Sequence, residues 1–170
     1  MQLEKLRLRW WAVALGGVVL AIGLLRWIAF QPYVIPSPSM EPTIMPGDHI
    51  LVNRLAYRFG VPSRGDVVVF AYPKDPRRTF VKRIVGLEGE TFELRDNQVF
   101  INGQAVQEPY LKPGDYPPYG PETIPAGKVL VLGDNRRESE DSREWGLLDR
   151  SFLIGKTCLI YYPLNRMKTF

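Results

Sequence analysis

The chain has 170 residues, enough for one domain with its own core once an N-terminal segment is set aside. Its net charge is +4, but Lys and Arg are dispersed among acidic residues, which excludes the basic footprint of a nucleic-acid-binding protein. The single cysteine, Cys158, excludes an intramolecular disulfide, and the single histidine, His49, excludes a multi-histidine metal site. We expect no metal and no cofactor.

The first predicted element is a membrane anchor. Residues 10–25 carry no charge, and the apolar character continues past Arg26 to Phe30, close to the roughly 20 residues of a spanning helix. Basic residues before this segment predict a cytoplasmic N-terminus, with everything after Phe30 on the outer side of the membrane. A cleaved signal peptide is the alternative. A retained anchor is favoured because no small-x-small cleavage site follows and Trp27 is typical of an interfacial residue.

A proline-rich segment, residues 35–43, follows the anchor closely and contains two hydroxyls, those of Ser37 and Ser39. Its three prolines fix φ and push the preceding residues toward extended geometry, so the segment is predicted to be a stiff loop. A stiff loop holds a nucleophile and an oxyanion donor in fixed positions. An ordinary serine-containing turn is the alternative interpretation of this segment alone.

Beyond residue 30 the chain alternates short apolar runs with Gly, Pro and Asn, which predicts a mainly β domain without long helices. The Asn102-Gly103 pair is typical of a type I′ hairpin. Residues 108–125 contain too many prolines for a central strand and are predicted to be a loop or extended ribbon. The predicted strands are His49–Asn53, Asp66–Tyr72, Thr79–Leu87, Thr91–Leu94, Gln98–Ile101, Gln104–Val106, Lys128–Leu132 and Gly155–Tyr162.

A serine nucleophile needs a base, and the candidate on sequence grounds is Lys82. His49 lies between Asp48 and a predicted strand, a position more typical of a surface residue than of a base. Lys82 shares one face of its strand with apolar neighbours, whose desolvating effect lowers the pKa of a lysine amine. Arg83 cannot take this role because a guanidinium does not lose its proton. Lys82 and Arg83 could also be ordinary edge-strand charges.

A polar loop, residues 133–146, follows the apolar run that ends at Leu132. Such loops are usually turns held by side-chain hydrogen bonds and ion pairs. Asp141 and Arg143 can form a bidentate pair that fixes this loop, which is a structural role.

Four motif blocks occur in one order along the chain. They are Pro36-Ser37-x-Ser39-Met40-x-Pro42-Thr43, Gly47-Asp48-x-Ile50-x-Val52, Arg64 to Phe70 leading to Lys82 to Leu87, and Gly133-Asp134-Asn135-Arg136-x-x-Ser139-x-Asp141-Ser142-Arg143-x-Trp145-Gly146. Together they resemble bacterial-type signal peptidase I, the membrane-bound Ser/Lys protease family, although Pro38 stands where that family often has Gly. The resemblance implies coiled antiparallel sheets, with residues 1–30 as the cytoplasmic N-terminus and transmembrane anchor and residues 31–170 as the outer peptidase domain. Within that domain, residues 88–127 match a region of variable size.

By this resemblance Ser39 is the nucleophile and Lys82 the general base. Ser37 and the Ser39 backbone N–H bind the oxyanion, and Ser139 orients the Lys82 amine. The apolar walls for the substrate residue before the scissile bond, and for the one two positions further back, match Tyr33, Ile35, Pro36, Met40, Ile44, Ile50, Val69, Phe80 and Val81. Tyr33 and Ile44 differ in size from the commonest family residues.

The expected function is removal of signal peptides from exported preproteins after a small-x-small motif. Preproteins and membrane lipid are the expected partners, without nucleic acid. Two alternatives remain open at this point. One is a Ser/Lys autoprotease of the repressor-cleavage type, and the other is a membrane-tethered β module that binds extended peptides without cleaving them.

Overall fold

The computed structural model describes residues 10–11, 15–19, 23, 29–111 and 114–170. The described residues before Phe30 are helical. Among the helices described, none is long and apolar enough to cross a membrane. The anchor expected up to Phe30 lies largely outside the described residues. Phe30 itself belongs to a β-strand and pairs there with Asn53 of the neighbouring strand.

A large, strongly coiled antiparallel sheet forms most of the domain. Its strand order is β1-β2-β11-β3-β4-β9-β10, and β12 pairs with β11. Its strands are β1 (Phe30–Val34), β2 (His49–Asn53), β3 (Val67–Tyr72), β4 (Asp75–Gly86), β9 (Lys128–Leu132), β10 (Leu148–Asp149), β11 (Leu153–Tyr162) and β12 (Lys168–Thr169). β1, which contains Pro32, lies at the edge, where a missing N–H costs no ladder hydrogen bond.

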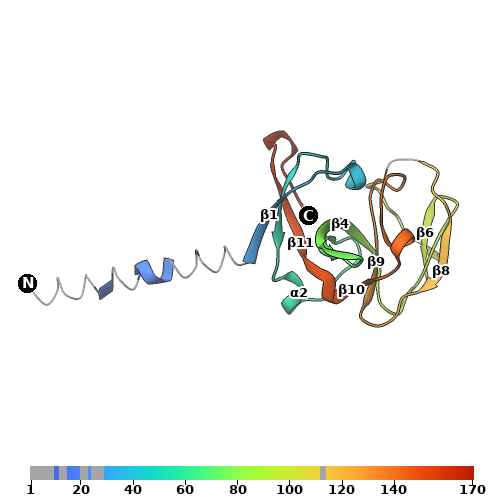
Figure 1. Ribbon diagram of the computed structural model, residues 1–170, viewed down its shortest axis with the longest axis horizontal. Helices are drawn as coiled ribbons and strands as arrows, with labels where there is room; N and C mark the ends of the chain where they lie inside the picture. The colour runs from blue at the N-terminus through green and yellow to red at the C-terminus, as the bar shows by residue number, and fades with distance from the viewer. Residues whose placement is uncertain (1–9, 12–14, 20–22, 24–28, 112–113) are drawn as a thin grey trace, which may run out of the picture.

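A second, four-stranded antiparallel sheet has the order β7-β6-β5-β8 and lies at the end of the domain opposite β1 (Figure 1). Its strands are β5 (Thr91–Arg95), β6 (Gln98–Ile101), β7 (Gln104–Ala105) and β8 (Tyr119–Thr123). Asn102 and Gly103 both have positive φ in the β6–β7 hairpin, as a type I′ turn requires, so that prediction is confirmed.

Short helices connect the strands. The α-helices are α2 (Ala56–Phe59) and α3 (Ser142–Trp145), and the 3₁₀ helices are η1 (Pro38–Met40), η2 (Arg150–Phe152) and η3 (Leu164–Arg166). Each of these helices is about one turn long, in agreement with the sequence, which shows no extended helical periodicity.

The core is divided by β3, whose residues Val67 to Phe70 are all buried. Val67 and Val69 pack in one cluster with Ile50, while Val68 and Phe70 pack in another with Ile84 and its neighbours. Side chains of a strand alternate between faces, so a strand with apolar residues at every position has a core on both sides. β3 therefore fixes its neighbour β4 firmly in the centre of the domain.

The prediction of a mainly antiparallel β domain is confirmed, with differences at the strand ends. β4 begins four residues earlier than expected, because Tyr72 pairs with Asp75 across a two-residue turn. β8 forms within the segment predicted to be a loop or ribbon, and it occupies a sheet edge. The short strands β1, β10 and β12 were not predicted.

Candidate active site

Ser39 lies in η1, a single turn that is fixed from two directions. From one side the Ile44 N–H donates to the Met40 carbonyl. From the other, the Asn135 N–H donates to the Ser39 carbonyl at 3.0 Å, and the Asn135 side-chain amide donates to the Pro38 carbonyl at 3.3 Å. The stiff loop predicted from the prolines is thus a turn whose carbonyls are held by the loop after β9.

The Lys82 amine reaches Ser39 from the centre of the large sheet. Its Nζ is 2.8 Å from Ser39 Oγ and also donates to the Val81 carbonyl at 3.1 Å. Both side chains are buried, with Lys82 4% and Ser39 8% exposed. Lys82 has no ion pair within the part of the chain that the structure describes. A buried amine in contact with a hydroxyl can exchange a proton with it.

Burial controls the protonation of Lys82. Desolvation lowers the pKa of its amine from 10.5 to about 8, and the nearby carboxylates of Asp141, Glu140, Asp134 and Glu144 oppose this shift. The Phe80 ring, whose centroid is 5.2 Å from Nζ, covers part of the amine. The desolvating strand face predicted from the sequence is therefore present, and it brings the pKa of the amine closer to neutral pH.

Ser37 Oγ is 3.3 Å from Ser39 Oγ, at the mouth of a cavity of about 510 Å³. Five of the nine predicted substrate-contacting residues line this cavity: Ile35, Pro36, Met40, Phe80 and Val81. The other four lie beneath it in the core cluster: Tyr33 is partly buried, and Ile44, Ile50 and Val69 are fully buried. These four support the cavity wall and are not part of its lining.

The Ser139 hydroxyl is buried and has no hydrogen-bond partner among the described residues, so the bond to Lys82 implied by the resemblance is not formed here. Ser139 packs against Gly133. A Cβ at Gly133 would overlap the Ser139 side chain and lie 2.5 Å from the Ser39 carbonyl oxygen. Gly133 thus allows three segments, those of Ser39, Ser139 and β9, to approach one another closely.

Two ion pairs fix the loop after β9 close to the Ser39 cavity. Arg143 binds Asp141 through two nitrogens, each 2.8 Å from a carboxylate oxygen, which confirms the predicted bidentate pair. Asp141 also accepts the Gly133 N–H at 3.0 Å. Arg83 binds Asp134 in the same bidentate manner, at 2.9 and 2.6 Å. This second pair joins the loop to β4, next to Lys82.

Several residues of the site were not predicted. Arg78, Thr79, Glu138 and Glu140 line the cavity beside the expected residues. Strand periodicity carried a signal for one of them, because Arg78 lies two and four positions from Phe80 and Lys82 and so shares their face of β4. Contacts of loop residues such as Asn135 depend on tertiary packing and leave no pattern in the sequence.

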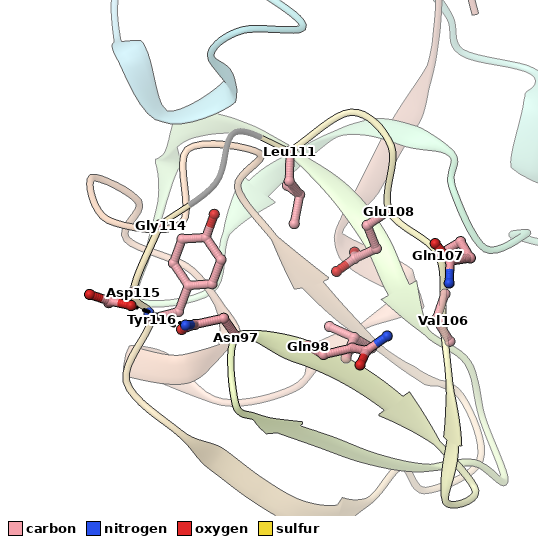
Figure 2. A pocket seen from close by; sticks show the side chains of 10 residues that line it. Asn97, Gln98, Val106, Gln107, Glu108, Leu111, Gly114, Asp115 and Tyr116 are labelled. Carbon is pink, nitrogen blue, oxygen red and sulfur yellow. Dashed lines mark hydrogen bonds between the residues drawn. The ribbon is translucent and has the colours of Figure 1, made fainter.

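A second cavity of about 510 Å³ lies beside the small sheet, and Figure 2 shows Glu108 and Leu111 turned toward its centre. It contains none of the predicted catalytic residues. Its one buried charge, Glu108, pairs with Arg136 at 2.5 Å. We therefore take the cavity at Ser39 as the candidate active site.

The remaining candidate nucleophile and base lie elsewhere. His49 packs against the rings of Tyr161 and Tyr162 at one end of β2 and does not line the Ser39 cavity. Cys158 is partly buried on β11, where its thiol donates to the Leu51 carbonyl and burial raises its pKa. Neither environment activates the side chain.

An antiparallel β domain in which a serine hydroxyl contacts a buried lysine amine fits a serine peptidase. The family described as "Signal peptidase, peptidase S26" matches residues 8–162. The chain is 42% identical to signal peptidase I of Leptolyngbya laminosa over 159 residues, covering 88% of this chain and 77% of that one. It is 34% identical to signal peptidase IB of Staphylococcus aureus over 176 residues, covering 93% and 91%.

A crystal structure of signal peptidase I from Enterococcus faecalis V583 has the same fold. The TM-score is 0.51 and the identity 31%, and the match covers 56% of this chain and 96% of that one. The chain therefore belongs to the signal peptidase (peptidase S26) family.

Proposed function

We propose that this chain removes N-terminal signal peptides from exported preproteins after a small-x-small motif, with Ser39 as nucleophile and Lys82 as general base. The observation that carries the proposal is the 2.8 Å contact between Ser39 Oγ and the Lys82 amine, buried at the base of a cleft. The names of the relatives, which are signal peptidases, support the same substrate.

The first half of the reaction forms an acyl-enzyme. The neutral Lys82 amine accepts the hydroxyl proton of Ser39 while Oγ attacks the carbonyl carbon of the scissile peptide bond. Negative charge moves to the carbonyl oxygen, toward which the Ser37 hydroxyl and the Ser39 backbone N–H donate. As the C–N bond breaks, the Lys82 ammonium returns its proton to the leaving amine, which is the N-terminus of the mature protein. The signal peptide remains esterified to Ser39.

In the second half, Lys82 accepts a proton from water, whose oxygen attacks the ester carbonyl. The tetrahedral intermediate collapses, Ser39 Oγ takes the proton back from Lys82, and the signal peptide leaves with a free carboxylate. In the proposed mechanism, the Ser139 hydroxyl orients the Lys82 amine, a role that the family resemblance implies. Asp141 and Arg143 have a structural role in holding that loop.

An extended peptide can bind along β4. β9 pairs with β4 only from Arg83 onward, so that Arg78 to Lys82 have no strand partner on this edge within the described chain. A peptide that adds a strand to this edge places alternate side chains against the apolar part of the cavity. Ile35, Met40 and Phe80 narrow that part, which favours small side chains such as Ala.

The proposed location is the outer side of the cell membrane, in keeping with a family that acts on secreted proteins. A single N-terminal anchor within residues 1–30, with a cytoplasmic N-terminus, would hold the peptidase domain, residues 31–170, at the membrane surface. The region of residues 88–127 then lies on the side of the domain remote from the point of attachment, as Figure 1 shows for β6 and β8 relative to β1. Preproteins and membrane lipid are the proposed partners.

The test is cleavage of a preprotein by the detergent-solubilised full chain, with the cut site mapped by mass spectrometry. We expect one cut after a small-x-small motif, absent in Ser39→Ala and retained in Ser151→Ala, a matched change at an exposed serine bound to Asp149. If the chain cleaves itself and leaves the preprotein intact, the result would favour an autoprotease. Peptide binding without acylation of Ser39 would favour a non-catalytic binding module.

A further inference from the structure

The rim of the active-site cleft carries a charged cluster outside the catalytic set. Arg78 on β4 and Glu140 on the loop after β9 face each other across the cleft, with Arg78 Nη2 3.7 Å from Glu140 Oε2. The Arg78 guanidinium lies over the stacked rings of Tyr72 and Phe80, 5.1 and 5.0 Å from their centroids. The interaction of Tyr72 with the nearby Glu140 carboxylate raises the Tyr72 pKa. The cluster therefore has a defined geometry, with Tyr72 buried and with Arg78 and Glu140 partly exposed.

Of the four carboxylates that oppose the lowering of the Lys82 pKa, three are each bound by an arginine. Asp141 is bound by Arg143, Asp134 by Arg83, and Glu140 by Arg78. The fourth, Glu144, is exposed to solvent at the start of α3. Each of these three carboxylates is thus paired with an arginine, and among the described residues the Lys82 amine donates hydrogen bonds to the Ser39 hydroxyl and the Val81 carbonyl oxygen.

Such pairing matters for a lysine that must lose its proton. A carboxylate that reached the amine would stabilise the ammonium form and convert a base into a fixed cation. Asp141 and Asp134 cannot approach, because both are buried and held by bidentate bonds. Glu140 can move more freely, because its side chain is 39% exposed, and it lines the same cavity as Lys82. Glu138 is a second exposed carboxylate in that lining, but no arginine is paired with it among the described ion pairs.

We propose that Arg78 is a positioning residue that holds the Glu140 carboxylate at the rim of the cleft and away from the Lys82 amine. This inference rests on the proposed function, in which Lys82 acts as the base. Without the guanidinium, Glu140 gains the freedom to turn into the cleft and pair with the ammonium form of Lys82. Arg78 is paired with Glu140, whereas the amine bonds to Ser39 and Val81, so the influence of Arg78 on Lys82 passes through Glu140.

The experiment compares the pH dependence of kcat/KM for the full chain in detergent, with a synthetic peptide that contains an Ala-x-Ala site. We expect Arg78→Gln to move the midpoint about 0.5 unit toward alkaline pH, with about threefold lower kcat/KM at pH 7 and an unchanged alkaline plateau. Glu140→Gln moves the midpoint the opposite way. Arg78→Lys, which keeps the charge, restores the wild-type midpoint.

The matched control is Arg77→Gln. Arg77 is the preceding residue of β4, its side chain is 89% exposed, and it pairs only with Asp75 on its own strand. We expect the wild-type pH profile for this variant. The double variant Arg78→Gln with Glu140→Gln separates an effect through Glu140 from an effect that does not need Glu140. If Arg78 acts through Glu140, the double variant has the same pH midpoint as Glu140→Gln alone.

Three results would overturn the inference: a midpoint in Arg78→Gln equal to that of Arg77→Gln, a loss of rate that is equal at every pH, or a double variant shifted from Glu140→Gln as far as Arg78→Gln is from wild type. Failure of the proposed function is distinguishable, because it appears as activity in Ser39→Ala. An inactive Ser39→Ala with an unmoved Arg78→Gln profile refutes the positioning role alone.

Discussion

Two neighbouring residues of β4 show opposite solutions to burying a positive charge. Arg83, 8% exposed, has a bidentate carboxylate partner in Asp134, donates to the Gly65 carbonyl at 2.8 Å and stacks 3.8 Å from the Tyr110 ring centroid. Lys82, 4% exposed, has a hydroxyl and a backbone carbonyl as partners. Because successive side chains of a strand point to opposite faces, the two cations occupy separate environments.

The difference shows how the same burial produces different chemistry. With a counter-ion, burial gives a permanent cation that joins β4 to the loop after β9. Without one, the charged form is penalised and the pKa of the amine falls to about 8, so that a fraction of the amine is neutral near physiological pH. The Arg83 side of the strand therefore serves the fold, and the Lys82 side serves the reaction at the expense of stability.

The largest effect is expected when the reactive pair is removed. Ser39→Ala and Lys82→Arg should each lower peptide cleavage by at least about 10³-fold, because nucleophile and base act as a unit. Lys82→Arg makes the sharper test, since it puts a permanent cation, as at Arg83, where the reaction needs a base. Circular dichroism should show an unchanged fold. Substantial cleavage by Lys82→Arg would remove the lysine from the base role.

A smaller loss is expected at the oxyanion position. Ser37→Ala should lower kcat by roughly 10²- to 10³-fold with little change in KM, as when one oxyanion donor is lost. Steady-state kinetics on the Ala-x-Ala peptide measure both constants. A raised KM with unchanged kcat would instead make Ser37 a binding residue.

On the structural side of the strand, the expected effect is on stability. Asp134→Asn leaves the buried Arg83 cation without its counter-ion and should lower the free energy of unfolding by roughly 3 kcal/mol or more. Asp75→Asn, which removes the partner of the exposed Arg77 side chain, is the control and should change the free energy of unfolding far less. Denaturant unfolding measures both. Equal losses for the two variants would mean that burial of the pair has no consequence.

The catalytic side should behave in the opposite way. Lys82→Met removes a buried amine without a counter-ion and should raise the free energy of unfolding by up to about 3 kcal/mol at pH 7 while abolishing activity. The sign follows from the lowered pKa. Between about pH 8 and 10.5 the unfolded wild-type chain binds more protons than the folded chain, so wild-type stability rises with pH. The advantage of Lys82→Met should therefore disappear above pH 10.5, and a constant advantage would contradict the account.

Much of the fold was predictable because its signals are local. Strand alternation, turn residues and the Asn-Gly pair located most of the β-strands within a few residues. The short strands β10 and β12 have two residues each, too few for any periodicity. β8 was missed because Pro121 argues against a strand, although a sheet edge tolerates it.

The site was predictable where chemistry restricts the choice of residue. The need for a nucleophile and a base made Ser39 and Lys82 candidates, and the family resemblance assigned them these roles. How deeply each apolar residue is buried could not be predicted. Ile44, Ile50 and Met40 were all predicted to contact the substrate, but Ile44 and Ile50 lie beneath the cavity. The Arg78–Glu140 pair joins residues 62 positions apart in sequence, and only the packing of β4 against the later loop brings them together.

The most direct test of the central claim is the pH dependence of kcat/KM for wild type and His49→Ala on the Ala-x-Ala peptide, which reports the ionisation of the free enzyme. The account expects activity to rise with pH through one midpoint near 8, because Lys82 must be neutral to accept the Ser39 proton. The profile should be the same in His49→Ala. A midpoint near 6.5 that is lost in His49→Ala, or a midpoint at the ordinary lysine value of about 10.4, would contradict the account.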